Sequence, residues 1–162
     1  MNLHVPIEEA PGCRCARAFD QLAPAYDTIW TNTPGGRLQR SIVWRRIDRL
    51  FTSGCRVLDI GCGTGEDCLH LMDFKIEALG VDASSEMVRI ARQRGVQAQH
   101  LTIEELHRIK GSFDGAISNF GALNCVEDLD LVRCSQARLI RPAGTLRSAL
   151  SVDFVPGSLR GT

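Results

Sequence analysis

A glycine-rich turn carries the strongest chemical signal in this sequence. Gly61, Gly63 and Gly65 alternate at the end of the stretch Val57–Gly65, directly after a short apolar run. Glycines at such a turn let the backbone adopt positive φ angles and approach a bound molecule closely. A helix that starts near Glu66 would point its free N–H groups at the same space. The turn therefore predicts a binding site for a small molecule.

Two carboxylates accompany this turn. Asp82 stands at the end of the next expected strand, where an acid can accept both hydroxyl hydrogens of a ribose. Asp59 stands just before the turn and suits a cationic group such as an ammonium. A nucleoside that carries an amino-acid tail would satisfy both carboxylates.

The spacing of the glycines separates two classes of cofactor. The dinucleotide fingerprint GxGxxG needs a further glycine where this chain has Glu66. Because a carboxylate at a helix start repels a pyrophosphate, a phosphate-free cofactor suits the turn better. An NAD(P)-dependent oxidoreductase is thus the less favoured alternative. The GxxxxGK[ST] pattern of a P-loop is absent.

The elements that would position these residues alternate between strand and helix. Helices are expected over 66–73, after Ser84 or Ser85, and over 128–140. This alternation predicts an α/β fold, a Rossmann-like doubly wound parallel sheet of about five strands with helices on both faces. Ligands bind such sheets beyond the carboxyl ends of the strands, where the glycine turn lies. The expected strands are 56–60, 76–81, 96–100, 113–120 and 145–154.

The chain before the first strand is expected to be largely helical. Residues 14–30 predict one or two short helices, and TNTPGG at 31–36 predicts a break. A second helix is expected to follow and to end at Gly54. Its buried apolar stripe would consist of Leu38, Ile42, Ile47, Leu50 and Phe51.

Composition indicates one globular domain. The chain has 162 residues, of which 44% are hydrophobic, with 19 acidic and 19 basic side chains. We expect a flexible N-terminus at 1–13, one domain at 14–155 and a tail at 156–162. The net charge of zero argues against nucleic-acid binding through bulk positive charge.

Cysteine usage and hydropathy indicate the compartment. An odd count of 7 cysteines and an acidic N-terminus without a signal pattern favour free thiols in the cytoplasm. Cys13 and Cys15 have no second pair to complete a zinc site, and no HExxH spacing occurs, so no metal site is predicted. No stretch reaches the about 20 apolar residues of a membrane-spanning helix, so no integral membrane contact is expected.

Several segments in order resemble the class I S-adenosylmethionine-dependent methyltransferases. They are VLDIGCGTG, VDAS, FDGAISNFGALNCVEDL and LIRPAGTL. Phe19–Asp27 resembles the N-terminal FDxxAxxYD helix of the small-molecule, quinone-biosynthesis-like type, and the whole likeness spans residues 17–146. The resemblance implies S-adenosylmethionine as cofactor and in-line transfer of its methyl group to a small-molecule acceptor.

The resemblance also implies roles for single residues. The turn would line the methionine portion, Asp59 would order the turn and the ammonium, and Asp82 would hold the ribose. Ala83 would touch the adenine through its backbone, Asn119 would offer a carbonyl near the ammonium, and Tyr26 would cover the cofactor. No general base is identified, so the catalytic residues stay unknown. The expected cofactor-binding residues are Tyr26, Asp59, Gly61, Cys62, Gly63, Gly65, Asp82, Ala83 and Asn119.

The sequence departs from the family pattern at two places. Thr102 stands where an aspartate is common, which leaves the adenine-edge contact unmatched. The family usually has seven strands, and the residues after Leu146 are too few for the last two, so a shortened enzyme is expected. The expected fifth strand alternates apolar and polar residues, and a homo- or hetero-oligomer could cover its exposed face or edge. A truncated, non-catalytic cofactor-binding fragment or partner subunit is the alternative.

Overall fold

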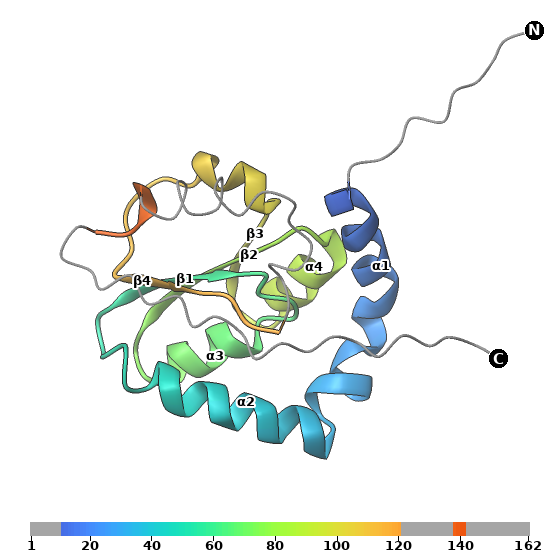
Figure 1. The fold of residues 1–162 in the computed structure, drawn as a ribbon, viewed down its shortest axis with the longest axis horizontal. Helices are drawn as coiled ribbons and strands as arrows, with labels where there is room; N and C mark the ends of the chain where they lie inside the picture. The colour runs from blue at the N-terminus through green and yellow to red at the C-terminus, as the bar shows by residue number, and fades with distance from the viewer. Residues whose placement is uncertain (1–10, 121–137, 142–162) are drawn as a thin grey trace, which may run out of the picture.

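A parallel β-sheet forms the centre of the molecule. The structure is a computed structural model and describes residues 11–120 and 138–141 (Figure 1). Within these residues the strands lie in the order β3-β2-β1-β4, and every pairing is parallel. The α/β fold with a parallel sheet is therefore confirmed. The strands are β1 (Arg56–Ile60), β2 (Glu77–Asp82), β3 (Gln97–His100) and β4 (Gly115–Ile117).

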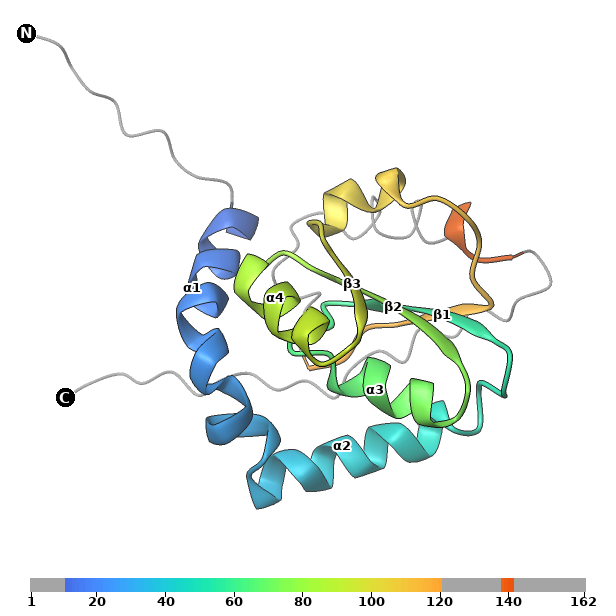
Figure 2. The same cartoon turned by 180° about the vertical axis from the view of Figure 1, so that it is seen from behind.

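Both faces of the sheet are covered, which explains why the buried residues of the inner strands β1 and β2 are apolar, with Asp59 as the exception. β1 buries residues 57–60 and β2 buries 78–81, whereas β3, at the edge, buries only Ala98. α3 (Glu66–Asp73) follows β1, and α4 (Ser85–Gln93) follows β2. Figures 1 and 2 show these helices beside the sheet. Side chains of α3 and α4 join one hydrophobic core, and the segment after β3 contributes to a second core.

The N-terminal part is more continuously helical than the sequence predicts. α1 (Pro11–Tyr26) accommodates Pro24, begins within the stretch expected to be flexible, and continues into a π-helical turn, η1 (Asp27–Thr31). α2 (Pro34–Ile47) begins inside the expected break. The Thr33 side chain accepts a hydrogen bond from the Gly36 N–H at 3.1 Å, and a proline is favoured in the first turn of a helix. The helix therefore starts at Pro34, and the break is shorter than the expected 31–36.

The face that α2 buries differs from the predicted apolar stripe. Leu38 is 62% exposed and Ile42 38% exposed, whereas Arg40 is only 7% exposed. The helix also ends at Ile47 rather than continuing to Gly54. The prediction was wrong for Leu38 and Ile42, because a buried carboxylate on α3, described below, draws Arg40 inward. It is confirmed for Ile47 and Phe51, which are 0% and 6% exposed, and for Leu50, which packs against the same core.

The segment between β3 and β4 contains an element that the sequence analysis missed. η2 (Ile103–Arg108) is a 3₁₀ helix, and the Thr102 N–H donates to Glu105 Oε2 at 3.1 Å at its start. β4 is shorter than the expected strand, and Phe113 pairs in parallel with Ile140. Most of the helix expected over 128–140, and all of the fifth strand and its proposed partner contact, lie outside the described residues. No helix among the described residues could cross a membrane.

Candidate functional site

An open cavity lies beyond the carboxyl ends of β1 and β2, where parallel sheets bind ligands. The empty space inside it, together with the open solvent at its mouth, amounts to about 960 Å³. Its walls come from α1, the glycine turn, the end of β2, the start of η2 and the residues after β4, with further side chains from α2, α3 and α4. Seven of the nine expected binding residues line it: Tyr26, Gly61, Cys62, Gly63, Asp82, Ala83 and Asn119.

Two glycines of the turn have different structural roles. Gly63 has a φ of +54°, and a Cβ added to it would meet nothing within 4 Å, so its bare backbone borders open space. Gly65 has a φ of +87°, and an added Cβ would lie 2.9 Å from Val96 Cγ2 and 3.2 Å from Ala91 Cβ. Gly65 therefore lets the turn pack against α4 and the chain before β3, and it does not line the cavity.

Asp82 is tied directly to the glycine turn. Its Oδ2 accepts the Gly63 N–H at 2.8 Å and its Oδ1 accepts the Ser84 N–H at 2.8 Å. Burial raises the pKa of Asp82, and these two backbone hydrogen bonds partly oppose that effect. Each carboxylate oxygen keeps a second acceptor position, so the group is still able to accept hydroxyl hydrogens from the cavity. Its role toward a ribose stays a prediction.

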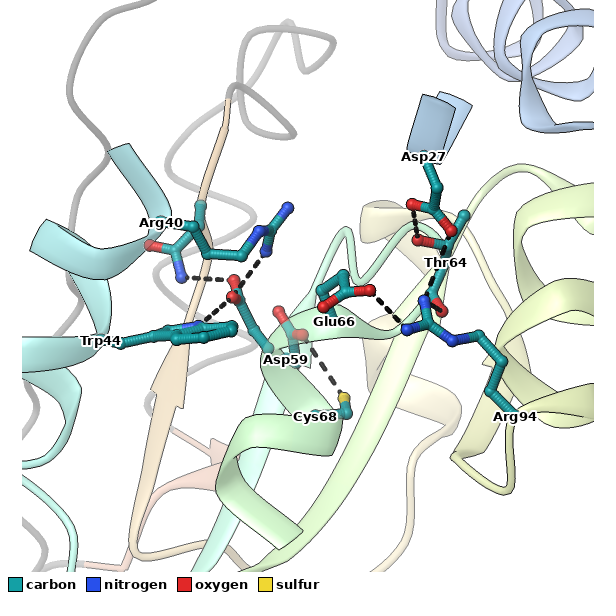
Figure 3. Close-up of polar contacts among 10 residues, drawn as sticks. Asp27, Arg40, Trp44, Asp59, Thr64, Glu66, Cys68 and Arg94 are labelled. Atoms are coloured by element: carbon teal, nitrogen blue, oxygen red, sulfur yellow. Dashed lines mark hydrogen bonds and ion pairs between the residues drawn. The ribbon is translucent and has the colours of Figure 1, made fainter. Parts of the chain in front are cut away.

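Asp59 lies beneath the turn and not on the cavity wall. It is 1% exposed, and Cys68 Sγ lies 3.4 Å from its Oδ2 (Figure 3). Burial, and next the nearby charge of Asp67, raise the pKa of Asp59 well above its usual range. Because its side chain points into the protein, Asp59 is not placed for a direct contact with a ligand in the cavity, and its role in ordering the turn stays a prediction.

Asp59→Asn is expected to change how stability depends on pH. Because the folded pKa of Asp59 is raised, its contribution to the free energy of unfolding is fully present below the unfolded pKa. That contribution is lost as the pH rises through the folded pKa. Urea unfolding at mildly acidic, neutral and mildly alkaline pH should therefore show Asp59→Asn gaining stability relative to the wild type as the pH rises. An identical gain in Asp73→Asn, which removes an exposed carboxylate at the end of α3, would contradict this assignment.

Cys62 turns its side chain from the glycine loop toward β2. It is 8% exposed, and a Cβ added at Gly80 would lie 2.7 Å from its Sγ, so the glycine in β2 makes room for the thiol. Burial, and next the charge of Asp59, raise the pKa of Cys62 well above its usual range. The thiol therefore stays neutral, in keeping with a packing role. The free cysteines of the described part are Cys15, Cys55, Cys62 and Cys68.

Tyr26 and Ala83 lie on different walls of the cavity. Tyr26 comes from the end of α1 and packs edge-on against Phe19, with ring centroids 6.4 Å apart. Burial raises the pKa of Tyr26, so its phenol stays protonated. Ala83 follows β2, and its carbonyl oxygen lies 3.0 Å from His100 Nε2. Both residues therefore line the cavity, and their contacts with a cofactor stay predictions.

A buried ion pair that the sequence analysis missed forms the inner wall. Arg40 Nη1 donates to Asp67 Oδ1 at 2.6 Å, and Trp44 Nε1 donates to the same oxygen at 2.8 Å (Figure 3). Asn119 Nδ2 donates to Asp67 Oδ2 at 2.9 Å, so the predicted binding residue Asn119 holds this carboxylate through its side chain. Arg40 also lies over the Phe120 ring, 4.5 Å from its centroid. The signal in the sequence was the four-residue spacing of Arg40 and Trp44, which places both on one helix face.

The charges on the cavity wall favour a cationic, phosphate-free ligand. Among the described lining residues, the acids are Glu66, Asp67, Asp82 and Glu104, and the one base is Arg40, which is paired with Asp67. A pyrophosphate would meet this excess of carboxylates unfavourably. The bare Gly63 backbone and the partly exposed Asp82 fit a sulfonium nucleoside instead.

The parallel α/β sheet, with a glycine turn after its first strand, is the fold of the class I S-adenosylmethionine-dependent methyltransferase family. The sequence matches the family described as a methyltransferase domain over residues 51–156, and the chain belongs to that family. S-adenosylmethionine is the cofactor of the class, and solved structures of similar proteins contain it or S-adenosylhomocysteine.

Relatives in two comparisons support this assignment. The chain is 39% identical over 107 residues to an uncharacterised protein of Methanocaldococcus jannaschii, covering 65% of this chain and 39% of that protein. It is 32% identical over 154 residues to demethylmenaquinone methyltransferase of Tropheryma whipplei, and the match covers 90% of this chain and 63% of that protein. The solved structure of phosphoethanolamine N-methyltransferase 2 of Haemonchus contortus in complex with S-adenosylmethionine superposes on this chain with a TM-score of 0.62 and 25% sequence identity. The superposition covers 77% of this chain and 31% of that protein. The chain thus spans less than two thirds of each of these proteins.

Proposed function

We propose that this chain binds S-adenosylmethionine in the cavity above β1 and β2 and transfers its methyl group to a small-molecule acceptor. The observation that carries the proposal is the placement of the open Gly63 backbone beside the Asp82 carboxylate, 2.8 Å apart, on the wall of this cavity. Membership of the methyltransferase-domain family supports the same chemistry.

The lining residues divide the cavity into regions of different chemistry. The glycine turn would hold the methionine portion, with Asn119 near its ammonium. Asp82 would accept the ribose hydroxyls. Ala83 and the apolar side chain of Leu101 would border the adenine.

The contribution of the protein to the reaction is chiefly orientation. When bound, S-adenosylmethionine supplies a methyl group that its sulfonium already activates. Holding an acceptor in line with that methyl group can supply much of the rate. Phe19 and Tyr26 of α1 line the cavity and would exclude water, and the neutral Tyr26 phenol could donate a hydrogen bond to an acceptor. The name of the Tropheryma relative supports a quinone-like or phenolic acceptor.

Calorimetric titration of the folded protein tests the cofactor. We expect saturable binding of S-adenosylmethionine and of S-adenosylhomocysteine, and no heat from NADH under the same conditions. Conversion of S-adenosylmethionine to S-adenosylhomocysteine in the presence of quinols, phenols or amines would then identify the acceptor class. NADH binding without S-adenosylmethionine binding would overturn the proposal in favour of an oxidoreductase.

A non-catalytic cofactor-binding unit, or one subunit of a larger enzyme, is the second candidate. The chain spans 39% of one relative and 63% of another, so the activity of a whole relative stays a proposal for this chain. Cofactor binding without turnover on any acceptor, with turnover restored by a companion chain, would support this candidate. Turnover by the purified chain alone would exclude it.

A further inference from the structure

The N-terminal segment formed by α1 and η1 lies along one side of the cavity, and hydrogen bonds attach it to the rest of the protein at two places. Tyr26 and Phe19 of this segment line the cavity, and α1 runs beside α4 (Figures 1 and 2). The first attachment is Asp20, whose Oδ1 accepts the Ser84 hydroxyl at 2.6 Å and the Glu86 N–H at 3.0 Å. This attachment joins α1 to the start of α4, next to the end of β2.

The second attachment joins the segment to the glycine turn itself. Asp27, the first residue of η1, accepts the Thr64 hydroxyl on Oδ1 at 2.8 Å (Figure 3). Its Oδ2 lies 3.4 Å from Arg94 Nη1. π-Helical turns are rare and concentrate at functional sites, and this one places a carboxylate against the middle of the turn.

Arg94 completes the connection from the other side. Its Nη1 also donates to the Thr64 carbonyl oxygen at 3.1 Å, and its Nη2 pairs with the carboxylate of Glu66 (Figure 3). Thr64 is 3% exposed and is thus held at its hydroxyl and at its carbonyl by residues distant in the sequence. Neither Asp27 nor Arg94 lines the cavity, whereas Thr64 and Glu66 both do.

We propose that Asp27 and Arg94 are positioning residues that couple closure of the α1–η1 segment to the conformation of the glycine turn. Gly63 and Gly65 flank Thr64 at φ of +54° and +87°, and glycine leaves the free turn many other conformations. The bonds from Asp27 and Arg94 to Thr64 select one conformation of the turn and link it to the segment that carries Tyr26. A cofactor that contacts the turn therefore holds the segment closed, and the preorganised site releases the cofactor slowly. The inference rests on the proposed function.

Cofactor dissociation and amide exchange test the coupling. Stopped-flow tryptophan fluorescence, to which Trp30 in η1 contributes, reports S-adenosylmethionine release. Asp27→Asn and Arg94→Gln are expected to speed release by about tenfold, as for the loss of one charge-assisted hydrogen bond. In the wild type, S-adenosylmethionine should slow amide exchange in residues 11–31, and in both variants that slowing should be lost while the strands keep their protection.

A matched control separates coupling from loss of charge. Arg89→Gln removes an exposed arginine–carboxylate pair on α4, with Glu86 at 2.9 Å, and should leave release and exchange unchanged. If both variants release S-adenosylmethionine and exchange their amides as the wild type does, the coupling is overturned and the proposed function stands. A uniform loss of protection across the whole protein would also overturn the coupling alone. A folded wild type that binds no S-adenosylmethionine would overturn the proposed function, and the coupling with it. If Asp27→Asn fails to fold, the release rate and amide exchange of Arg94→Gln test the coupling instead.

Discussion

Asp82→Ala is expected to weaken S-adenosylmethionine binding by about 100-fold or more. The Asp82 carboxylate faces the cavity beside the glycine turn and would lose its bonds to the ribose hydroxyls. Each hydrogen bond to a charged group contributes about 1.5–3 kcal/mol, so the loss of two corresponds to at least about two powers of ten. The same substitution removes the 2.8 Å bond that holds Gly63, which also loosens the turn. Isothermal titration calorimetry measures the change.

Acidification should reproduce part of this loss. A protonated Asp82 has fewer acceptor positions for hydroxyl hydrogens, so affinity should fall as the pH drops through its pKa. Because burial raises the pKa of Asp82, that fall should begin at a higher pH than for an ordinary aspartate. Asp82→Asn should bind weakly and should lack this pH dependence.

Asp114 provides a matched control for the Asp82 variants. Its Oδ2 accepts the Arg56 N–H at 2.8 Å, so it too is a partly buried aspartate that holds backbone, but at the opposite end of β1. Asp114→Ala should leave the dissociation constant within about twofold of the wild type. Equal losses in the two alanine variants would show that Asp82 acts through general stability and not through the cofactor.

Arg40→Met is expected to lower the free energy of unfolding by about 3–5 kcal/mol, the largest stability effect that we predict. Arg40 is 7% exposed and Asp67 4% exposed, and their side chains meet at 2.6 Å. Removing the guanidinium leaves an uncompensated buried carboxylate, which is the costly case for a buried ion pair. The bonds from Trp44 and Asn119 stay but supply no positive charge. Urea unfolding followed by circular dichroism measures the loss.

A double variant identifies the cause of that loss. In Arg40→Met with Asp67→Asn the buried charge is gone and an oxygen still accepts the Trp44 N–H, so much of the stability should return. Arg89→Met, which removes an exposed pair, should cost no more than about 1 kcal/mol. A loss in Arg40→Met no larger than in Arg89→Met would contradict a structural role for the buried pair.

The parts of the fold that the sequence predicted are those governed by near neighbours in the chain. Local sterics and short-range hydrogen bonds account for the apolar runs of β1 and β2, for the glycines between β1 and α3, and for the cap of α4. In that cap the Ser84 Oγ accepts the Met87 N–H at 3.1 Å. The same local rules place Asp82 beside the turn, since consecutive parallel strands end at one edge of the sheet.

The predictions that differed from the structure concern the direction of side chains relative to distant elements. Apolar spacing alone suggested that Leu38 and Ile42 are buried, but Asp67, from α3, attracts Arg40 and so decides which face of α2 turns inward. Asp59 was expected near an ammonium, yet its position on a central strand points it into the protein.

The sequence by itself therefore determined the strand–turn–helix unit, the chemistry of its glycines and acids, and the cofactor class that they suit. Only the tertiary structure decided how that unit is completed. Asp27 reaches Thr64 across 37 positions of the chain, and Arg40 reaches Asp67 across 27. Such pairs carry no local periodicity, because their geometry is set by how whole helices pack on the sheet and by the need to pair each buried charge.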